Sequence, residues 1–416
     1  MDYTTYFEAA SKAQEAMLTL TSKTVDHVLL DLAKTVREHS DFLLAENKKD
    51  LLRMDEKDPK YDRLKLTVGR IESIASDMIN IAHLTSPIDT VMEEKQLDNG
   101  LSLKKVRVPL GVVSVIYEAR PNVTLDVFAL CFKTKNVAVL KGGSDAFFSN
   151  QAIMQVVNQV LDKHHISRNI VVLLPVERAA TEALLNAVGY VDVLIPRGSQ
   201  QLIHFIRANS RVPVIETGAG IVHTYFDQSG DVKKASLIID NAKTRKVSAC
   251  NALDCLLVHE ERIRDLPQLT AGIAQKKVEV YADPQAYDQL AAIYPTGLLH
   301  HADVEHFGTE FLSMKMAIKT VSSFEEAVEH IRRYGSRHSE AIIAEEADTI
   351  AAFMNKIDAS AVYANASPAF TDGAQFGLGA EIGISTQKLH ARGPMGLVEL
   401  TSYKWLISGN GQIRLS

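Results

Sequence analysis

The sequence predicts an α/β fold made of two parallel-sheet domains and a small β arm. The chain begins with a segment of helical periodicity and continues with two series in which short β-branched runs alternate with helical segments. Strand-like segments lie before the first series and near the end of the chain. Alternation of this kind is typical of βαβ crossovers, which build parallel sheets. With 416 residues, the chain is long enough for two or three domains.

The flanking segments predict the helices and the arm. Between about 6 and 84, apolar residues recur at three- and four-residue spacing, which predicts amphipathic helices. After the turn signal at 98–100, residues 101–108 alternate in polarity and predict an exposed strand. Residues 400–414 predict a second short strand. We expect it to pair with 101–108 or with another subunit, because exposed strand edges are usually covered.

The two alternating series predict the elements of the two sheets. In the first series, strands are expected at 112–116, 137–140, 170–173, 191–195 and 212–215, with helices at 123–132, 146–161, 177–188 and 200–209. In the second series, strands are expected at 256–258, 316–320, 341–344 and 361–363. The boundary between the domains is placed at 218–230, which contains three glycines.

Composition and charge exclude several classes of function. The formal net charge is -6 and the pI is about 6.2, so no overall positive field is available to hold a nucleic acid or an acidic membrane surface. No apolar run approaches the roughly 20 residues that span a bilayer, and no signal peptide is expected. Three scattered cysteines do not make a disulfide framework, and the histidines lack metal-ligand spacing. We therefore expect a cytoplasmic protein that acts on small molecules without a bound metal.

Cys250 is the candidate nucleophile. It lies in a stretch of mostly small residues, 246–254, that leads into an apolar run. A thiolate attacks an acyl carbon only if it is exposed and its ionised form is supported locally, and a small-residue loop gives a substrate access. The alternative is that Cys250 is a packing residue, as free cysteines often are. Cys131 and Cys255 lie inside apolar runs and are expected to be packing residues.

Two strand-to-helix turns are candidates for cofactor binding, although no GxGxxG follows the first expected strand. The first turn contains Lys141, Gly142 and Gly143, and its lysine could meet ribose hydroxyls or a 2′-phosphate at the carboxyl end of a strand. The second contains Gly198 and Ser199 and could approach a pyrophosphate or an anionic substrate. Such turns also need glycine for backbone reasons alone, and this alternative stays open.

The loop after the first expected strand contains Arg120 and Asn122. Arg120 could bind a carboxylate or phosphate. The Asn122 amide donates hydrogen bonds without titrating, which suits an oxyanion. An Arg-Pro-Asn sequence is also favourable for a turn, so a purely structural role is the alternative.

In this order, these pieces resemble the gamma-glutamyl phosphate reductase family of the aldehyde dehydrogenase superfamily. The likeness covers nearly the whole chain, and seven ordered matches are far more specific than any one. The matching segments are VPLGVV at 108–113, YEARPNVT at 117–124, LKGG at 140–143, IPRG at 195–198, VIETGAG at 214–220, CNA at 250–252 and GISTQKLHARGPMGL at 383–397.

The resemblance implies an aldehyde-dehydrogenase-like architecture. It implies an NADPH-binding domain at 1–100 and 109–220, a catalytic domain at 221–395, and an oligomerisation arm at 101–108 and 396–416. The implied activity is that of an NADP-dependent oxidoreductase. It reduces L-glutamyl 5-phosphate to L-glutamate 5-semialdehyde and phosphate through a cysteine thioester, the second step of proline biosynthesis from glutamate. A homo-oligomer, dimer or tetramer, is also implied, with room for functional coupling to glutamate 5-kinase.

The resemblance also implies roles for individual residues. Cys250 resembles the nucleophile, and Asn122 with the backbone N–H of Cys250 resembles the oxyanion site. Lys141 matches the contact to the adenosine ribose, with the glycines beside it, and Glu310 resembles the glutamate that holds the nicotinamide ribose. Glu216 occupies the position of the base that activates water in hydrolytic relatives. Because this reaction has no use for such a water, we expect Glu216 to be a cofactor-loop or structural residue.

Two other functions stay open at this point. One is a hydrolytic aldehyde-oxidising dehydrogenase of the same superfamily, which would act independently of phosphate. The other is a non-catalytic assembly protein that has kept the fold, although Cys250, Asn122 and Lys141 are all present. Lys141 can meet the ribose of NADPH or of NADH. Arg120 and Arg392 are the candidates for binding the substrate's anionic groups.

Overall fold

The structure, a computed structural model, describes residues 2–58 and 60–414. Residues 1 and 59 of the predicted first domain and 415–416 of the predicted arm lie outside the described residues. The chain divides into two compact units, of which the first is Met1–Thr217, Gly377–Gly383 and Met395–Ser416, and the second is Gly218–Phe376 and Ile384–Pro394. Residues 377–383 thus lie with the first unit, whereas the sequence prediction grouped them with the second.

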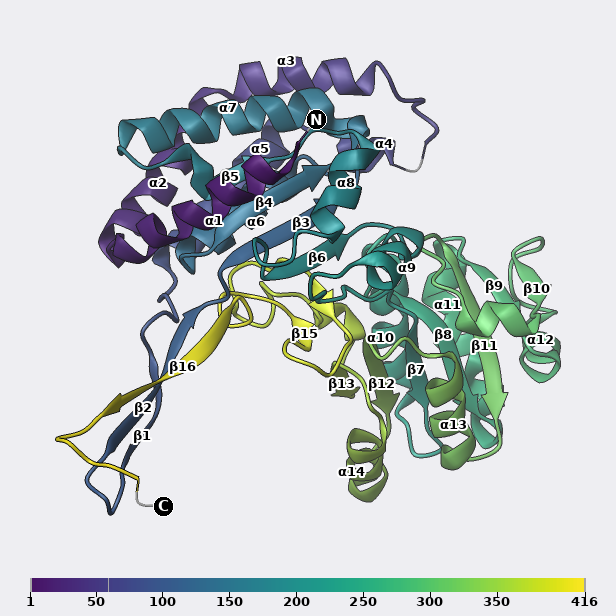
Figure 1. Ribbon diagram of the computed structural model, residues 1–416. Coiled ribbons are helices and arrows are strands. Elements are labelled where there is room, and N and C mark those ends of the chain that lie inside the picture. Colours follow the sequence, from purple (N-terminus) through teal and green to yellow (C-terminus); the bar gives the residue numbers. More distant parts are fainter. Residues whose placement is uncertain (1, 59, 415–416) are drawn as a thin grey trace. The chain divides into compact units, whose positions relative to one another are not determined.

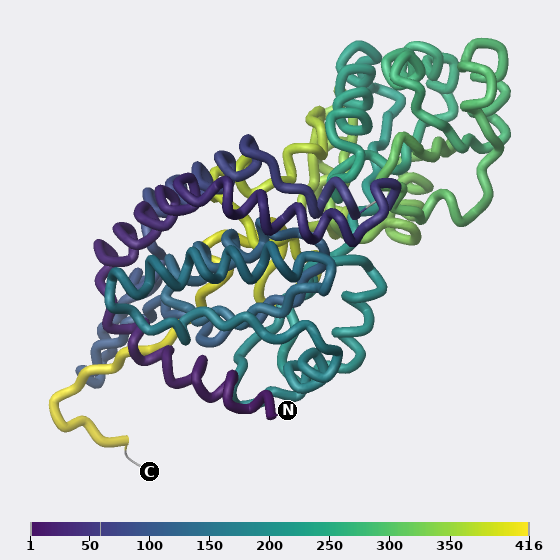
Figure 2. Tube along the Cα trace, turned by 90° about the horizontal axis from the view of Figure 1, so that it is seen from above, coloured from purple at the N-terminus to yellow at the C-terminus, as the bar shows by residue number. Residues whose placement is uncertain are grey.

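Helices fill the N-terminal part of the first unit, as the sequence predicted. Two of them begin at threonine N-caps, because the hydroxyls of Thr21 and Thr67 accept the backbone N–H of Thr24 and Arg70. Figures 1 and 2 both show α3 alongside α7, and α2 packs on α5. The helices are α1 (Thr4–Thr19), α2 (Ser22–Glu38), α3 (Ser40–Leu51), α4 (Tyr61–Leu64) and α5 (Val68–His83).

A parallel sheet of order β5-β4-β3-β6 follows. Every residue of β3 and β4 is buried, which explains their continuous apolar runs. The chain winds from β3 to β4 and β5 on one side and then to β6 on the other, so a topological switch point lies between β3 and β6. The elements are β3 (Val112–Tyr117), α6 (Asn122–Lys133), β4 (Val137–Gly142), η1 (Ser144–Ala146), α7 (Phe147–Lys163), η2 (Arg168–Ile170), β5 (Val171–Leu173), α8 (Arg178–Leu185), β6 (Val193–Arg197) and α9 (Gln200–Asn209).

The prediction of a strand at 212–215 is wrong. In the structure only Val214 makes an isolated bridge, to Leu194. Pro213 explains the difference, because proline has no N–H to give to a ladder, although its carbonyl accepts the N–H of Leu194.

The arm is a three-stranded antiparallel sheet in which β2 (Ser102–Pro109) lies between β1 (Val91–Gln96) and β16 (Thr401–Ser408). The predicted pairing of the C-terminal strand with 101–108 is confirmed, with Thr401 opposite Pro109 and Ser408 opposite Ser102. Strand β1 was not predicted, because half of its residues are charged and all but one are exposed. In Figure 1 these strands extend away from the helices of the first unit.

The second unit contains a parallel sheet of order β10-β9-β11-β8-β7-β12-β13. The four predicted strands are present as β8, β11, β12 and β13, whereas β7, β9 and β10 were not among the predicted strands. The elements are β7 (Val222–Phe226), α10 (Val232–Thr244), β8 (Leu253–His259), η3 (Glu260–Asp265), α11 (Leu266–Gln275), β9 (Glu279–Ala282), α12 (Pro284–Leu290), β10 (Leu299–His301), η4 (Val304–Gly308), β11 (Lys315–Val321), α13 (Phe324–Tyr334), β12 (Ser339–Ile343), α14 (Ala347–Lys356), β13 (Ala361–Ala364), η5 (Pro368–Phe370), β14 (Ile384–Ser385) and β15 (Gly393–Pro394).

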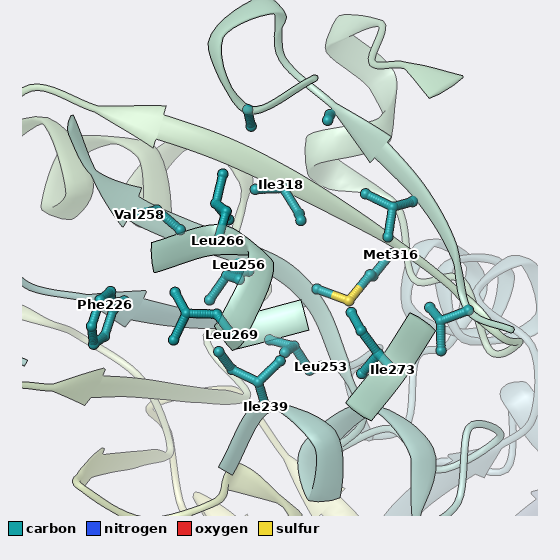
Figure 3. Packing of buried hydrophobic residues seen from close by; sticks show 14 of the residues in the cluster. Phe226, Ile239, Leu253, Leu256, Val258, Leu266, Leu269, Ile273, Met316 and Ile318 are labelled. Carbon is teal, nitrogen blue, oxygen red and sulfur yellow. The ribbon is translucent and has the colours of Figure 1, made fainter. Parts of the chain in front are cut away.

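Apolar side chains bury both faces of this second sheet. Figure 3 shows one face, where Leu256 and Val258 of β8 pack near Ile239 of α10 and Leu269 of α11. The alternate residues of β8, including Cys255, belong to a second cluster on the opposite face, with residues of α13 and α14. No helix within 2–58 and 60–414 is long and apolar enough to cross a bilayer.

Candidate active site

Lys141 lies at the carboxyl end of β4. Its Nζ donates to the carbonyl oxygens of Gly142, at 3.1 Å, and Val176, at 3.2 Å. The side chain is buried, and burial lowers the pKa of Lys141, while Glu177 acts in the opposite direction. The first sheet therefore presents a fixed ammonium group at the edge where open α/β sheets bind ligands.

The two glycines beside Lys141 differ in the space available for a side chain. A Cβ on Gly142 would lie 2.4 Å from Nδ2 of Asn150 and 3.3 Å from the hydroxyl of Tyr117, so the buried Asn150 side chain would have to move. A Cβ on Gly143 would make only ordinary contacts, at 3.8 Å or more. Packing can therefore explain a glycine at position 142, but it gives no steric reason for a glycine at position 143.

The loops after β3 and β6 meet at the switch point of the first sheet. Ser199 caps α9, and its own N–H donates to Oε2 of Glu118 at 3.1 Å. A Cβ on Gly198 would lie 2.9 Å from the same carboxylate oxygen. Glu118 was not predicted as a site residue, although it lies within the YEARPNVT segment. Its carboxylate occupies the N-terminus of α9, where an anion is favoured.

Asn122 begins α6 and is tied to the next turn of that helix. Its Nδ2 donates to Oδ2 of Asp126 at 2.9 Å, which fixes the amide plane. Burial raises the pKa of Asp126 to about 6. Arg120 lies in the turn just before, is partly exposed, and accepts the N–H of Val123 on its carbonyl. This part of the first unit thus holds an oriented amide donor next to a guanidinium group.

Cys250 lies in a turn directly before β8 and is partly exposed. Cys131 and Cys255 are buried, as the sequence predicted. Burial raises the pKa of the Cys131 thiol to about 12 and raises that of Cys255 well above its usual value. The cysteine that a substrate can reach is therefore Cys250.

Close backbone contacts fix the Cys250 turn. A Cβ on Gly220 would lie 1.5 Å from the carbonyl oxygen of Cys250, so the two backbones touch. The N–H of Gly220 donates to Oε1 of Glu310 at 2.9 Å, which brings Glu310 to the same place. From the next residue, Asn251, Nδ2 donates to the carbonyls of Ala369 and Thr371 at 3.2 and 3.0 Å.

A buried ion pair supports the strand that follows. Nζ of Lys243 lies 3.8 Å from Oδ1 of Asp254, and this carboxylate also accepts the N–H of Phe311 at 3.1 Å. Burial raises the pKa of Asp254 and lowers that of Lys243. The pair anchors the segment after Glu310 to β8. Sequence reasoning assigned neither residue a role, although Asp254 is the last residue of the 246–254 stretch around Cys250.

These residues lie toward the amino edge of the second sheet, because Gly220, Cys250 and Glu310 come two, three and five residues before the first residues of β7, β8 and β11. Arg392 contacts a different part of the second unit, where its Nη2 donates to Oδ1 of Asp358 at 2.7 Å. In the first unit, Oε2 of Glu216 lies 3.4 Å from Nη1 of Arg207.

No family model matches the chain. Among curated proteins, it is 59% identical over 406 residues to gamma-glutamyl phosphate reductase from Pelodictyon phaeoclathratiforme, covering 98% of this chain and 97% of that protein. It is 56% identical over 408 residues to the protein of that name from Bacteroides thetaiotaomicron, covering 98% of each.

Solved structures agree. The crystal structure of gamma-glutamyl phosphate reductase from Thermotoga maritima matches with a TM-score of 0.95 and 36% identity over the whole of both chains. An acetylating aldehyde dehydrogenase from Geobacillus thermoglucosidasius matches with a TM-score of 0.71 and 17% identity, over 99% of this chain and 97% of that one, and supports the fold alone. This chain is therefore an oxidoreductase that belongs to the gamma-glutamyl phosphate reductase family and has the aldehyde dehydrogenase fold.

Proposed function

We propose that this protein reduces L-glutamyl 5-phosphate to L-glutamate 5-semialdehyde and phosphate, with NADPH as reductant and Cys250 as the acyl-carrying nucleophile. The names of its relatives support the reaction. The observation that carries the cysteine assignment is the contrast between Cys250, which is partly exposed and held against Gly220, and the two buried cysteines. The reaction would serve the synthesis of proline.

The Cys250 sulfur carries the covalent chemistry. Its thiolate forms a bond to the acyl carbon, and the bond from that carbon to the phosphate oxygen breaks, so phosphate leaves with the electron pair. NADPH, when bound, supplies the hydride that reduces the acyl group. Reduction of the thioester gives a thiohemiacetal oxyanion. Its oxygen re-forms the carbonyl as the carbon–sulfur bond breaks, which returns the electron pair to the sulfur and releases the aldehyde. For Asn122 we keep the oxyanion role, which is supported by an amide that Asp126 orients.

The first unit has groups that suit a dinucleotide. We assign Lys141 and the turn of Gly142 and Gly143 to the adenosine ribose, and Gly198 with Ser199 to the pyrophosphate. The buried Lys141 ammonium and the N-terminus of α9 are donors of the kind that ribose oxygens and phosphates accept. In the second unit we assign Glu310 to the nicotinamide ribose. Its contact with Gly220 supports a position beside Cys250.

Substrate recognition is assigned to arginines. Arg120 is partly exposed and can bind the phosphate or carboxylate of the substrate. Arg392 is the second candidate, although its guanidinium donates to Asp358, a carboxylate that also binds Lys388 at 2.8 Å. A substrate that uses Arg392 would therefore share it with Asp358.

The reverse reaction tests the proposal. NADPH formation from glutamate semialdehyde should require inorganic phosphate and should fall by roughly four orders of magnitude or more in Cys250→Ala. The matched control is Cys131→Ser, which changes a buried thiol and should keep the rate per folded molecule. Phosphate-independent turnover would favour a hydrolytic dehydrogenase instead, and an unchanged rate in Cys250→Ala would exclude the nucleophile assignment. The ratio of rates with NADP+ and NAD+ decides the cofactor.

We further propose a cytoplasmic homo-oligomer that assembles through the arm. Cys131 and Cys255 are buried thiols, which suits a reducing compartment. Strand β16 is an edge strand, and its Tyr403, Trp405 and Ile407 are exposed. Light scattering should therefore show an oligomer that Ile407→Glu weakens, and a monomeric wild-type chain would contradict the proposal.

A further inference from the structure

A second cluster of reactive side chains lies inside the second unit. His223 of β7 and Cys255 of β8 are directly opposite each other in the parallel ladder, so their side chains leave the same face of the sheet. His330 reaches them from α13. One ligand atom from each of the three residues lies within 4.8 Å of the other two, and all three residues are buried.

The His223 ring is oriented and incompletely satisfied. Its Nδ1 lies 3.1 Å from Oε2 of Glu340, an oxygen that also accepts the backbone N–H of His223. A carboxylate on Nδ1 favours the tautomer with the proton there and leaves a lone pair on Nε2. That Nε2 is buried and has no hydrogen-bond partner among the described residues, and the same holds for Oε1 of Glu340. An unpaired polar atom in a core is unfavourable, so we expect a partner from outside the protein chain.

The other two ligand atoms face each other. Nε2 of His330 lies 3.9 Å from Sγ of Cys255. The His330 ring is held between Phe307 and Tyr334, with ring centroids 5.5 and 4.7 Å away. Two ligands of a tetrahedral zinc ion, at roughly 2.0 and 2.3 Å from the metal, are about 3.5 Å apart. A shift of a few tenths of an ångström would therefore bring this pair to ligand spacing.

We propose that His223, Cys255 and His330 form a binding site for a borderline-soft divalent ion such as Zn²⁺. Two imidazoles and one thiolate are a donor set that zinc prefers, and a carboxylate behind a ligating histidine is its usual support. Binding would replace the S–H bond of Cys255 by a sulfur–metal bond and release the proton to solvent. The ion would tie α13 to β7 and β8, and the proposal does not depend on the chemistry at Cys250.

A neutral apolar cluster is the alternative. In that case the Cys255 thiol donates weakly to His330 and nothing satisfies Nε2 of His223. The two cases differ in whether the full-length protein takes up one equivalent of metal.

Cobalt is a suitable probe, because Co²⁺ bound to a thiolate gives a charge-transfer absorption that Co²⁺ bound to nitrogen and oxygen lacks. All proteins carry Cys250→Ser, so that the accessible thiol contributes nothing. After dialysis against a chelator, titration with Co²⁺ should give this band with a stoichiometry of one, Zn²⁺ should displace it, and Zn²⁺ should raise Tm. Elemental analysis of the undialysed protein gives the metal content.

Variants show which thiol gives the charge-transfer absorption band. Cys255→Ser should abolish it, whereas Cys131→Ser, which removes another buried thiol, should keep it. Should Cys255→Ser fail to fold by circular dichroism, His330→Gln decides, and it should lose stoichiometric binding. Glu340→Gln should weaken binding about 10- to 100-fold. The proposal is overturned if the Cys250→Ser protein shows no thiolate band, or if the band survives in Cys255→Ser or in His330→Gln.

Discussion

The two parallel sheets present candidate site residues at opposite kinds of edge. In the first sheet the residues lie at the carboxyl ends of the strands, as Lys141 is the next-to-last residue of β4 and Ser199 follows the end of β6. In the second sheet they precede the strands, as Cys250 precedes β8. The means of support also differ. At the first edge, side chains bind a backbone N–H or a nearby carbonyl, whereas at the second edge main chain lies directly on main chain.

This difference fits two different tasks. A surface that binds and releases a cofactor can tolerate side chains that rearrange, such as Glu118 on the N-terminus of α9. A nucleophile must stay in place, because misplacement by about 1 Å costs roughly 10²-fold in rate. We therefore expect substitutions at the second edge to affect turnover, and substitutions at the first edge to affect affinity or pH dependence.

Among substitutions that leave Cys250 itself unchanged, the largest effect is expected for Gly220→Ala. The new Cβ would lie 1.5 Å from the carbonyl oxygen of Cys250 and 2.5 Å from its carbonyl carbon, and backbone atoms cannot rotate away. The Cys250 turn must move, so kcat should fall by about 10²-fold or more. Steady-state kinetics measure this loss, and a thiol reagent should show that Cys250 is still present and accessible.

Gly69→Ala is the matched control for Gly220→Ala. Gly69 is exposed in α5, and the nearest atom to its Cβ would be Oγ1 of Thr67 at 4.0 Å. This change should keep the rate and stabilise the helix by about 0.5–1 kcal/mol. A Gly220→Ala enzyme with normal kcat would show that the contact with Cys250 is unimportant.

The next effect is expected for Asn251→Ala. This change leaves the buried carbonyls of Ala369 and Thr371 without the amide that they accept. Chemical denaturation should show a loss of about 2–4 kcal/mol, and kcat should fall more than KM changes. Asn186→Ala removes a similar bond, to the carbonyl of Glu182, at an exposed position and should cost much less. Equal losses in the two variants would contradict the positioning role.

The sequence patterns predicted most of the fold because the elements of both sheets are nearly continuous apolar runs. Where burial is partial, the patterns were insufficient. Strand β9 shows only alternate burial, and β10 is three residues long at the edge of its sheet. The strand prediction at 212–215 was wrong for a different reason. The β-branched residues of this segment favour a strand, but Pro213 has no N–H to give to a ladder.

The candidate site was predictable only where a local pattern carries it. Cys250 was found through the small residues around it. Asn251 and Glu118 act through partners that lie far away in the sequence, the carbonyl of Thr371 and the N–H of Ser199. Proximity of this kind arises only when the chain folds. The same reason explains why Cys255 could be predicted to be buried but not to lie beside two histidines.

At the first edge, Asp126→Asn should change how stability depends on pH. Burial raises the pKa of Asp126 to about 6, whereas in the unfolded chain it titrates near 4. The unfolded state loses this proton first, so this group lowers the free energy of unfolding as pH rises from about 4 to 6. Above pH 7, Asp126→Asn should therefore be more stable than wild type by about 1–2 kcal/mol, allowing for partial exposure.

Asp162→Asn is the control of opposite sign. The pKa of Asp162 is lowered by its hydrogen bond to Arg168, so this carboxylate stabilises the fold above its unfolded pKa, and its removal should lower stability at pH 7. Denaturation curves at pH 5 and pH 8 measure both variants. If Asp126→Asn and wild type keep the same difference at the two pH values, Asp126 does not titrate as the structure indicates.

The smallest effects are expected for Glu118→Gln, which should make the fold less stable but cofactor binding tighter. The change removes a negative charge from the N-terminus of α9, which should cost about 0.3–1 kcal/mol of stability. A phosphate that uses the same Ser199 N–H no longer has to displace a carboxylate, so KM for NADPH should fall a few-fold while kcat stays constant. Glu182→Gln, an exposed change on α8, should leave KM unchanged. A rise in KM for NADPH in Glu118→Gln would mean that this carboxylate helps to hold the cofactor. The N-terminus of α9 could then not be assigned to the pyrophosphate, although it lies at the edge assigned to the cofactor.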